Sequence, residues 1–214
     1  EHVFTLLLAL RRSLIAYHND VQAGRWQNSQ IFCLLDHPIG ELYGSTLGII
    51  GYGALGQAVE KLAHAFGMRT LVSERKSSAD VRKGRVSFED VLSVSDVITL
   101  HCPLNQETRG LIGAPEFAKM KRKALLINCG RGGLVDEKAL FDVLESGLIA
   151  GAGIDVLENE PPVSGNILLD AVSPNLIVTP HIAWASREAM QTLADRLISN
   201  IEGFVKGAPQ NDEK

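Results

Sequence analysis

Short apolar runs recur along this chain, and longer stretches with one apolar face lie between them. Each run has the length of a β-strand, and several are apolar at nearly every position, which is typical of strands covered on both faces. The predicted strands are 47–50, 70–73, 96–100, 124–128, 150–154 and 176–179. The predicted helices are 54–66, a short helix opened by Ser87, 114–121, 136–145 and 186 to about 205. Because strands separated by helices pair in parallel through right-handed crossovers, we predict an α/β fold with a doubly wound parallel sheet, as in Rossmann domains.

Before the first strand the pattern changes from helical to irregular. Residues 1–24 carry apolar side chains at helical spacing and end at Gly24, which predicts one helix. From Arg25 to Ser45, here called the arm, this periodicity is lost. The arm nevertheless contains the large apolar side chains of Trp26, Phe32, Leu34, Leu35 and Ile39. Such side chains need a cover, and both a second subunit and the arm's own domain remain open as that cover.

The first predicted strand runs directly into a glycine-rich turn. Its sequence is Gly51-Tyr52-Gly53-Ala54-Leu55-Gly56, with glycines in the pattern Gly-x-Gly-x-x-Gly. The first glycine allows a tight turn, the second lets the backbone approach a pyrophosphate, and the third lets helix and strand pack closely. The following helix directs its unpaired N–H groups and the positive end of its dipole at the anion. Because strand, turn and helix occur in this order, with Glu74 about 20 residues further on, we predict a dinucleotide site.

Glu74, at the end of the second predicted strand, bears on which dinucleotide binds. A carboxylate there accepts hydrogen bonds from the adenosine ribose diol and repels a 2′-phosphate, which favours NAD over NADP. Arg75 and Lys76 follow it directly. These cations could stack on adenine, neutralise a phosphate or lie in solvent, so NADP stays open as the less favoured cofactor.

The composition of the chain indicates which classes of partner to exclude and which cellular compartment to expect. The 214 residues carry a net charge of −4 with acidic and basic residues mixed, so neither nucleic acid nor a membrane is an expected partner. Cys33, Cys102 and Cys129 are odd in number and lack CxxC spacing, which argues against a disulfide framework or a structural zinc site. We therefore expect a cytoplasmic protein without a metal site.

In a doubly wound sheet, ligands bind beyond the carboxyl ends of the strands, so catalytic residues are expected there. Arg131 follows one predicted strand between glycines, where its guanidinium could hold a substrate carboxylate. His181 follows the last strand, and an imidazole can transfer a proton near neutral pH. Glu160 lies in a proline-rich turn, and it would stabilise the imidazolium if it reached His181. Each could be an ordinary loop residue, but their joint placement at successive strand ends favours a catalytic set. By contrast, His101 and Cys102 are expected to pack against the cofactor.

Together these motifs resemble the D-2-hydroxyacid dehydrogenase family, which includes D-phosphoglycerate, D-lactate, glycerate and formate dehydrogenases. The resemblance covers essentially the whole chain. Its matching segments are 51–56, 101–104 with 107–110, 128–133 with 136–137, 155–156 with 160–161, and 180–183. A finer similarity to glycerate dehydrogenases, also called hydroxypyruvate reductases, rests on Phe32–Pro38 and Glu74–Lys76.

The resemblance implies that Arg131, Glu160 and His181 interconvert a D-2-hydroxy acid and a 2-keto acid with NAD. It also implies that Asp155 lies near the nicotinamide amide. Together with the strand-end rule, it gives the predicted cofactor-binding residues Gly51, Gly53, Ala54, Leu55, Gly56, Glu74, Arg75, His101, Cys102, Pro103, Cys129, Gly130, Asp155 and Ala183. A homodimer around the cofactor domain is implied as well, and the apolar arm suits it.

Members of the family also have a substrate-side domain, formed by residues before and after the cofactor domain, and it is largely absent here. The expected layout is a helix and dimerisation-type arm at 1–45, the NAD-binding domain at 46–184, a bridging helix at 185–208 and a frayed tail at 209–214. With half of the cleft missing, we expect this chain to bind NAD but to turn over poorly alone. The alternative is a non-catalytic NAD(H)-sensing module like the corepressors built on this fold, against which the retained catalytic set argues.

Overall fold

The computed structural model describes residues 1–78, 80–171 and 173–208 of the chain. They fall into two compact units, Glu1–Pro180 and the residues from His181 onward. The predicted tail at 209–214 lies outside the described residues.

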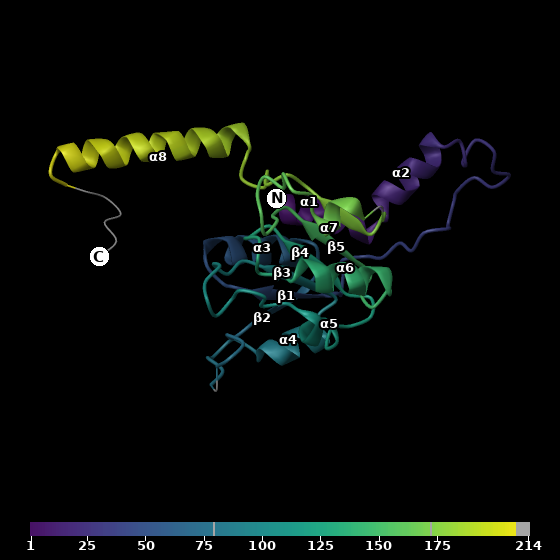
Figure 1. The fold of residues 1–214 in the computed structure, drawn as a ribbon, viewed down its shortest axis with the longest axis horizontal. Helices are drawn as coiled ribbons and strands as arrows, with labels where there is room; N and C mark the ends of the chain where they lie inside the picture. The colour runs from purple at the N-terminus through teal and green to yellow at the C-terminus, as the bar shows by residue number, and fades with distance from the viewer. Residues whose placement is uncertain (79, 172, 209–214) are drawn as a thin grey trace. The chain divides into compact units, whose positions relative to one another are not determined.

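The first unit is built on a parallel sheet (Figure 1). Its described strands are β1 (Thr46–Ile50), β2 (Arg69–Val72), β3 (Val97–Leu100), β4 (Leu125–Asn128), β5 (Gly151–Ile154) and β6 (Leu176–Val178). They lie in the order β2-β1-β3-β4-β5-β6, and every neighbouring pair is parallel. This confirms the predicted doubly wound sheet. Because β2 and β3 flank β1, the strand order reverses there, which is where such sheets open a ligand crevice.

Helices cover both faces of the sheet. One face packs on α1 (His2–Arg11) and α3 (Ala54–Ala65), and the other packs on α4 (Phe88–Val94), α5 (Ala114–Phe117), α6 (Glu137–Glu145) and α7 (Ile167–Asp170). Strand side chains alternate between the two cores: Leu47 and Ile49 belong to the first, and Ile98 and Leu100 to the second. All four are fully buried, which explains why the strands are apolar at nearly every position.

The prediction of one helix over residues 1–24 is wrong. The segment forms α1 and α2 (Leu14–Gln22), separated at Ser13, whose φ of 49° is left-handed. The arm supplies hydrogen bonds at this break: the Gly40 N–H donates to the Arg11 carbonyl at 2.8 Å, and the Ser13 hydroxyl donates to the Pro38 carbonyl at 2.6 Å. The returning arm thus pairs the Arg11 carbonyl, which a continuous helix would have paired internally.

Two smaller differences concern short helices. The structure ends α5 at Phe117, earlier than the predicted residue 121. It also contains α7, which the sequence reading missed, as a single turn capped by the Asn166 side chain. A segment of four residues is too short to show helical periodicity.

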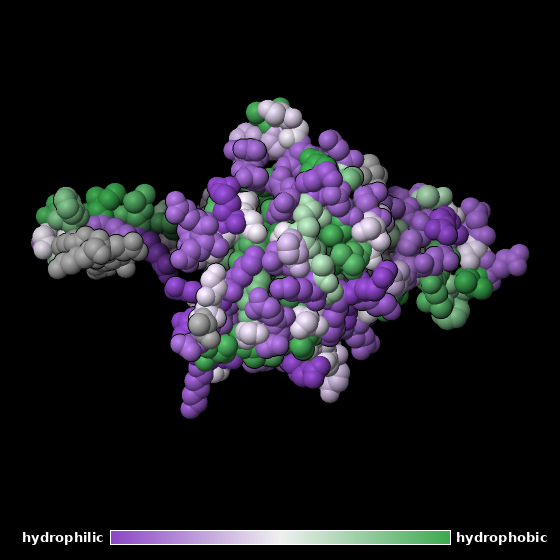
Figure 2. All heavy atoms as spheres, turned by 60° about the horizontal axis from the view of Figure 1, so that its bottom comes forward, coloured by the Kyte–Doolittle hydropathy of each residue, from purple (hydrophilic) through white to green (hydrophobic). Residues whose placement is uncertain are grey.

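The second unit contains α8 (Arg187–Val205), which begins as predicted after Ser186, whose hydroxyl accepts the Ala189 N–H. Its apolar side chains are exposed, including Leu193, Leu197, Ile198, Ile201 and Phe204. Figure 2 shows hydrophobic side chains along α8 and, separately, on the arm. Among the described helices, none is long and apolar enough to pass through a bilayer.

Candidate active site

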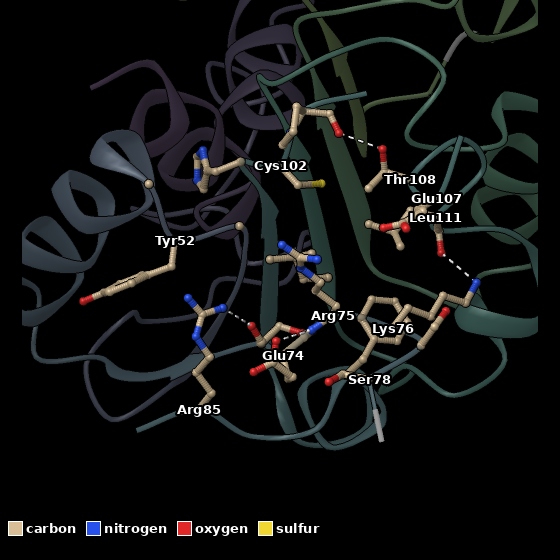
Figure 3. Close-up of a pocket in the computed structure, with 18 of the residues that line it drawn as sticks. Tyr52, Glu74, Arg75, Lys76, Ser78, Arg85, Cys102, Glu107, Thr108 and Leu111 are labelled. Carbon is tan, nitrogen blue, oxygen red and sulfur yellow. Dashed lines mark hydrogen bonds between the residues drawn. The ribbon is translucent and has the colours of Figure 1, made fainter. Parts of the chain in front are cut away.

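A cavity of about 710 Å³ opens at the carboxyl ends of β1, β2 and β3 (Figure 3). Its walls come from the glycine-rich turn, the β2–α4 loop and the β3–α5 loop. It is lined by 50–53, 73–78, Arg82, Arg85, Phe88, 101–103, Asn105, Glu107, Thr108 and Leu111. Both its size and its place at the reversal of strand order are those of a nucleotide site.

The three glycines of the turn meet three different needs. Gly51 has a φ of +94°, and a Cβ there would lie 2.4 Å from the Cys102 nitrogen, so only glycine fits. A Cβ on Gly56 would lie 2.4 Å from the Gly51 carbonyl oxygen, so this glycine lets α3 pack on β1. Beside Gly53 there is nothing within 4 Å, and no side chain caps α3. Open space beside an uncapped helix N-terminus fits a pyrophosphate.

Glu74 is buried, at 4% exposed, and hydrogen-bond donors surround its carboxylate. Oε1 accepts the Arg75 N–H at 2.9 Å and Nη2 of Arg82 at 2.5 Å, and Oε2 accepts Nε of Arg82 at 2.7 Å. The Arg82 guanidinium lowers the pKa of Glu74 to about 2. Glu74 is therefore ionised, and it already has a cationic partner within the chain.

Sequence reasoning missed the role of Arg82. It stands eight residues after Glu74 in an irregular loop, and no spacing rule places it against the carboxylate. The same holds for Phe88, which is buried beneath the Lys76 ammonium, 5.7 Å from its ring centre. Lys76 is also held by Glu116, with 2.9 Å between Nζ and Oε1. Lys76 thus joins the β2–α4 loop to α4 and α5.

Near neutral pH, the side chains of His101 and Cys102 at the end of β3 and of Cys129 after β4 are uncharged. Burial lowers the pKa of His101 to about 4, and its Nε2 lies 3.0 Å from the Thr99 hydroxyl. Burial also raises the pKa of the Cys102 thiol, and it raises that of Cys129 to about 12. Near neutral pH none of the three carries a charge, so they suit packing against a ligand more than proton transfer or nucleophilic attack.

Asp155 follows β5 and is 1% exposed. The Thr179 hydroxyl donates to its Oδ1 at 2.5 Å, and His2 Nε2 lies 2.9 Å from that hydroxyl and 3.4 Å from Oδ1. The start of α1 and the end of β6 therefore hold the carboxylate in place. His2 had no predicted role, because it lies 153 positions before Asp155 in the sequence.

The loops after β4 and β5 are locked together. A Cβ on Gly132 would lie only 1.7 Å from the Leu157 carbonyl oxygen, so this contact requires glycine. On one side of it Arg131 is exposed, and its Nη1 donates to the Gly130 carbonyl at 2.8 Å. On the other side Glu160 Oε1 accepts the Leu157 N–H at 2.8 Å. The structure thus brings the loops of two predicted catalytic residues together at one edge of the sheet.

His181 and Ala183 belong to the second unit of the chain. His181 has a left-handed backbone, with a φ of 56°. Its position relative to Arg131 and Glu160 therefore stays a prediction, as do the individual roles of the predicted site residues.

The parallel sheet, the glycine-rich turn and the cavity at the reversal of strand order define a dinucleotide-binding domain. Residues 4–183 match the family model described as "D-isomer specific 2-hydroxyacid dehydrogenase, NAD binding domain". The chain belongs to this family, and its cofactor is NAD, as predicted.

Named relatives agree with the family. Glycerate dehydrogenase of Methylorubrum extorquens is 56% identical over 99% of this chain, and hydroxypyruvate reductase of Blautia hydrogenotrophica is 42% identical over 92%. The crystal structure of D-lactate dehydrogenase from Aquifex aeolicus with NAD and lactic acid has a TM-score of 0.82 at 31% identity and covers 97% of the chain. The chain spans 66%, 62% and 66% of these three proteins, respectively.

Proposed function

We propose that the protein is an NAD-dependent oxidoreductase that interconverts a D-2-hydroxy acid and a 2-keto acid. The observation that carries this proposal is the contact at Gly132, which leaves no room for a Cβ and locks the loop of Arg131 against that of Glu160. A dinucleotide site alone requires no arginine and carboxylate at this place. The arginine is suited to holding a substrate carboxylate beside the cofactor, and the carboxylate on the neighbouring loop is suited to stabilising a protonated imidazole.

The cofactor, when bound, supplies or accepts a hydride at the nicotinamide ring. Arg131 binds the substrate carboxylate and orients the neighbouring carbonyl. His181 donates a proton to the carbonyl oxygen during reduction and removes it during oxidation. Glu160 orients His181 and stabilises its protonated form. The assignment of these three roles rests on the resemblance of the surrounding motifs to the family.

The substrate class that we propose is glycerate and hydroxypyruvate. This choice comes from the names of the similar proteins of Methylorubrum extorquens and Blautia hydrogenotrophica. We also propose that the protein acts as a homodimer in the reducing cytoplasm. The exposed apolar arm supports the homodimer. The three unpaired cysteines, Cys33, Cys102 and Cys129, support the reducing compartment.

A panel of 2-keto acids tests the proposed reaction. Purified full-length protein is mixed with NADH and hydroxypyruvate, glyoxylate, pyruvate or phosphohydroxypyruvate, and loss of absorbance at about 340 nm is followed. We expect the highest kcat/KM with hydroxypyruvate. Tight NADH binding by the full-length protein without reduction of any of the four acids would contradict the proposal.

A further inference from the structure

The carboxylate of Glu137 binds both ends of the turn that contains Glu160. This turn, residues 158–166, follows β5 and leads into α7. Glu137 Oε1 accepts the Glu158 N–H at 2.7 Å, and Oε2 accepts Nδ2 of Asn166, also at 2.7 Å. Each oxygen thus has its own donor, and the two donors stand at opposite ends of the turn. The side chain of Glu137 therefore closes the turn and fixes its ends.

Asn166 connects the same carboxylate to the next helix. Its Oδ1 accepts the Leu168 N–H at 2.9 Å and so caps α7, while its Nδ2 donates to Glu137. Glu137 lies in the first turn of α6, and α6 and α7 lie side by side (Figure 1). Both side chains are half-buried, so water competes less for their hydrogen bond than it would at an open surface. The turn is thus anchored on two helices.

The middle of the turn has little packing of its own. Val163 is 89% exposed. The N–H groups of Val163 and Gly165 donate to carbonyls within the turn, those of Pro161 and Pro162, at 2.8 and 3.0 Å. Because these bonds are local and apolar packing is sparse, the order of the turn depends strongly on how its two ends are held. The position of Glu160 between those ends therefore depends on the carboxylate that binds them.

We propose that Glu137 is a positioning residue for Glu160. The inference rests on the proposed function, in which Glu160 orients His181. Glu137 acts through the turn: by fixing both ends it keeps Glu160 in one place. Without this constraint the proton donor is correctly oriented for less of the time, so kcat falls. Binding of the substrate carboxylate depends on Arg131 and changes little, so KM stays nearly the same.

Glu137→Gln and Asn166→Asp test this role by exchanging donor and acceptor. In E137Q one carboxylate oxygen becomes an NH2 group, so one of the two donors loses its acceptor. In N166D two carboxylates face each other, which also breaks the contact. In the double variant E137Q/N166D the new amide donates to the new carboxylate, and its oxygen still accepts the Glu158 N–H. Aspartate caps a helix as well as asparagine does, so α7 is retained.

Steady-state kinetics of the full-length protein with NADH and hydroxypyruvate give the first measurement. We expect kcat to fall about tenfold or more in each single variant, with KM and the NADH dissociation constant within about threefold. In the double variant kcat should return to within about threefold of the unaltered protein.

Asp136→Asn is the matched control for these variants. It removes the same charge from the neighbouring residue, and its amide oxygen can still accept the Ala139 N–H, which Asp136 Oδ1 accepts at 2.9 Å. The kcat of D136N should stay within about twofold of the unaltered value, because the contacts of Glu137 remain.

Limited proteolysis of the same full-length proteins, without any ligand, gives a second measurement. Cleavage after Glu158 by a glutamate-specific protease requires the turn to open locally. We expect this cleavage to be about fivefold faster or more in E137Q and N166D, and close to the unaltered rate in E137Q/N166D and D136N.

An unchanged kcat in E137Q, or no recovery in the double variant, would overturn the proposal. Faster cleavage with an undiminished kcat would also overturn it, because that result is expected if Glu137 only stabilises the start of α6. If the unaltered protein reduces none of the keto acids, the proposed function fails and this inference fails with it. Reduction that proceeds equally well in E137Q removes this inference alone.

Discussion

His101 places a titratable but uncharged ring at the end of β3. Burial holds the pKa of its imidazole at about 4, compared with 6.5 for an ordinary histidine. Between these two values the unfolded chain binds a proton that the folded chain does not. The free energy of unfolding therefore falls as the pH drops from 6.5 to 4, by at most about 3 kcal/mol from this group.

Substituting His101 by Gln should remove this loss. Glutamine keeps a polar partner for the Thr99 hydroxyl but does not titrate. Urea unfolding at pH 7 and pH 4.5 measures the effect in both proteins. We expect the unaltered protein to lose about 2 kcal/mol more than H101Q between these pH values. Equal losses in the two proteins would show that His101 is not held neutral by burial.

The carboxylates of Glu74 and Asp155 show the limit of prediction for single residues. The sequence placed Glu74 at a strand end, because the strand pattern and the distance from the glycine turn are local features. It did not reveal that Arg82 covers this carboxylate, since that contact depends on how an irregular loop folds back. Nor did it reveal that His2 and Thr179 hold Asp155, because these residues meet only through packing of the whole sheet.

In the glycine-rich turn between β1 and α3, we expect Gly53 to matter for cofactor binding and Gly56 to matter for the stability of the fold. Gly53 has open space around its missing Cβ, whereas a Cβ at Gly56 would lie 2.4 Å from the Gly51 carbonyl oxygen. We therefore expect Gly53→Ala to leave the unfolding free energy within about 1 kcal/mol and to weaken NADH binding at least tenfold, because a methyl group would occupy the approach to the pyrophosphate.

Gly56→Ala is the matched variant at this turn. It should destabilise the fold by about 1–3 kcal/mol, because backbone must shift to admit the methyl group. Thermal unfolding and NADH titration of both variants provide the test. If G53A unfolds as readily as G56A, or binds NADH normally, the two glycines do not have the separate roles described.

At the scale of elements, the strands and the caps of the longer helices could be predicted because their signals are local. Ser87, Asp136 and Ser186 each cap a helix as expected. The break between α1 and α2 could not be predicted, because Pro38 and Gly40 bind there from a distant part of the chain. The lone turn α7 is too short for any periodicity.

At the scale of the whole molecule, the arm presents apolar side chains without cover in the described chain. Phe32 is 90% exposed and Leu35 is 74% exposed. A second copy of the chain is the cover that we propose. Sedimentation of the purified protein should show a dimer, and Phe32→Ser with Leu35→Ser should shift it towards monomer without changing its circular dichroism spectrum at about 25 °C. The matched control is Gln30→Ser, which removes no apolar surface. A monomer at high concentration of the unaltered protein would contradict the dimer.

We propose that a cofactor site on β1 to β3 and a substrate site at the ends of β4 and β5 act together on a D-2-hydroxy acid. The most direct test mixes the full-length protein with NAD and either D- or L-glycerate, and measures the rate of NADH formation. We expect NADH to form with the D isomer only. In His181→Gln, we expect the rate to fall at least a thousandfold while the NADH dissociation constant stays within threefold. Equal rates with both isomers, or an undiminished rate in H181Q, would contradict the account.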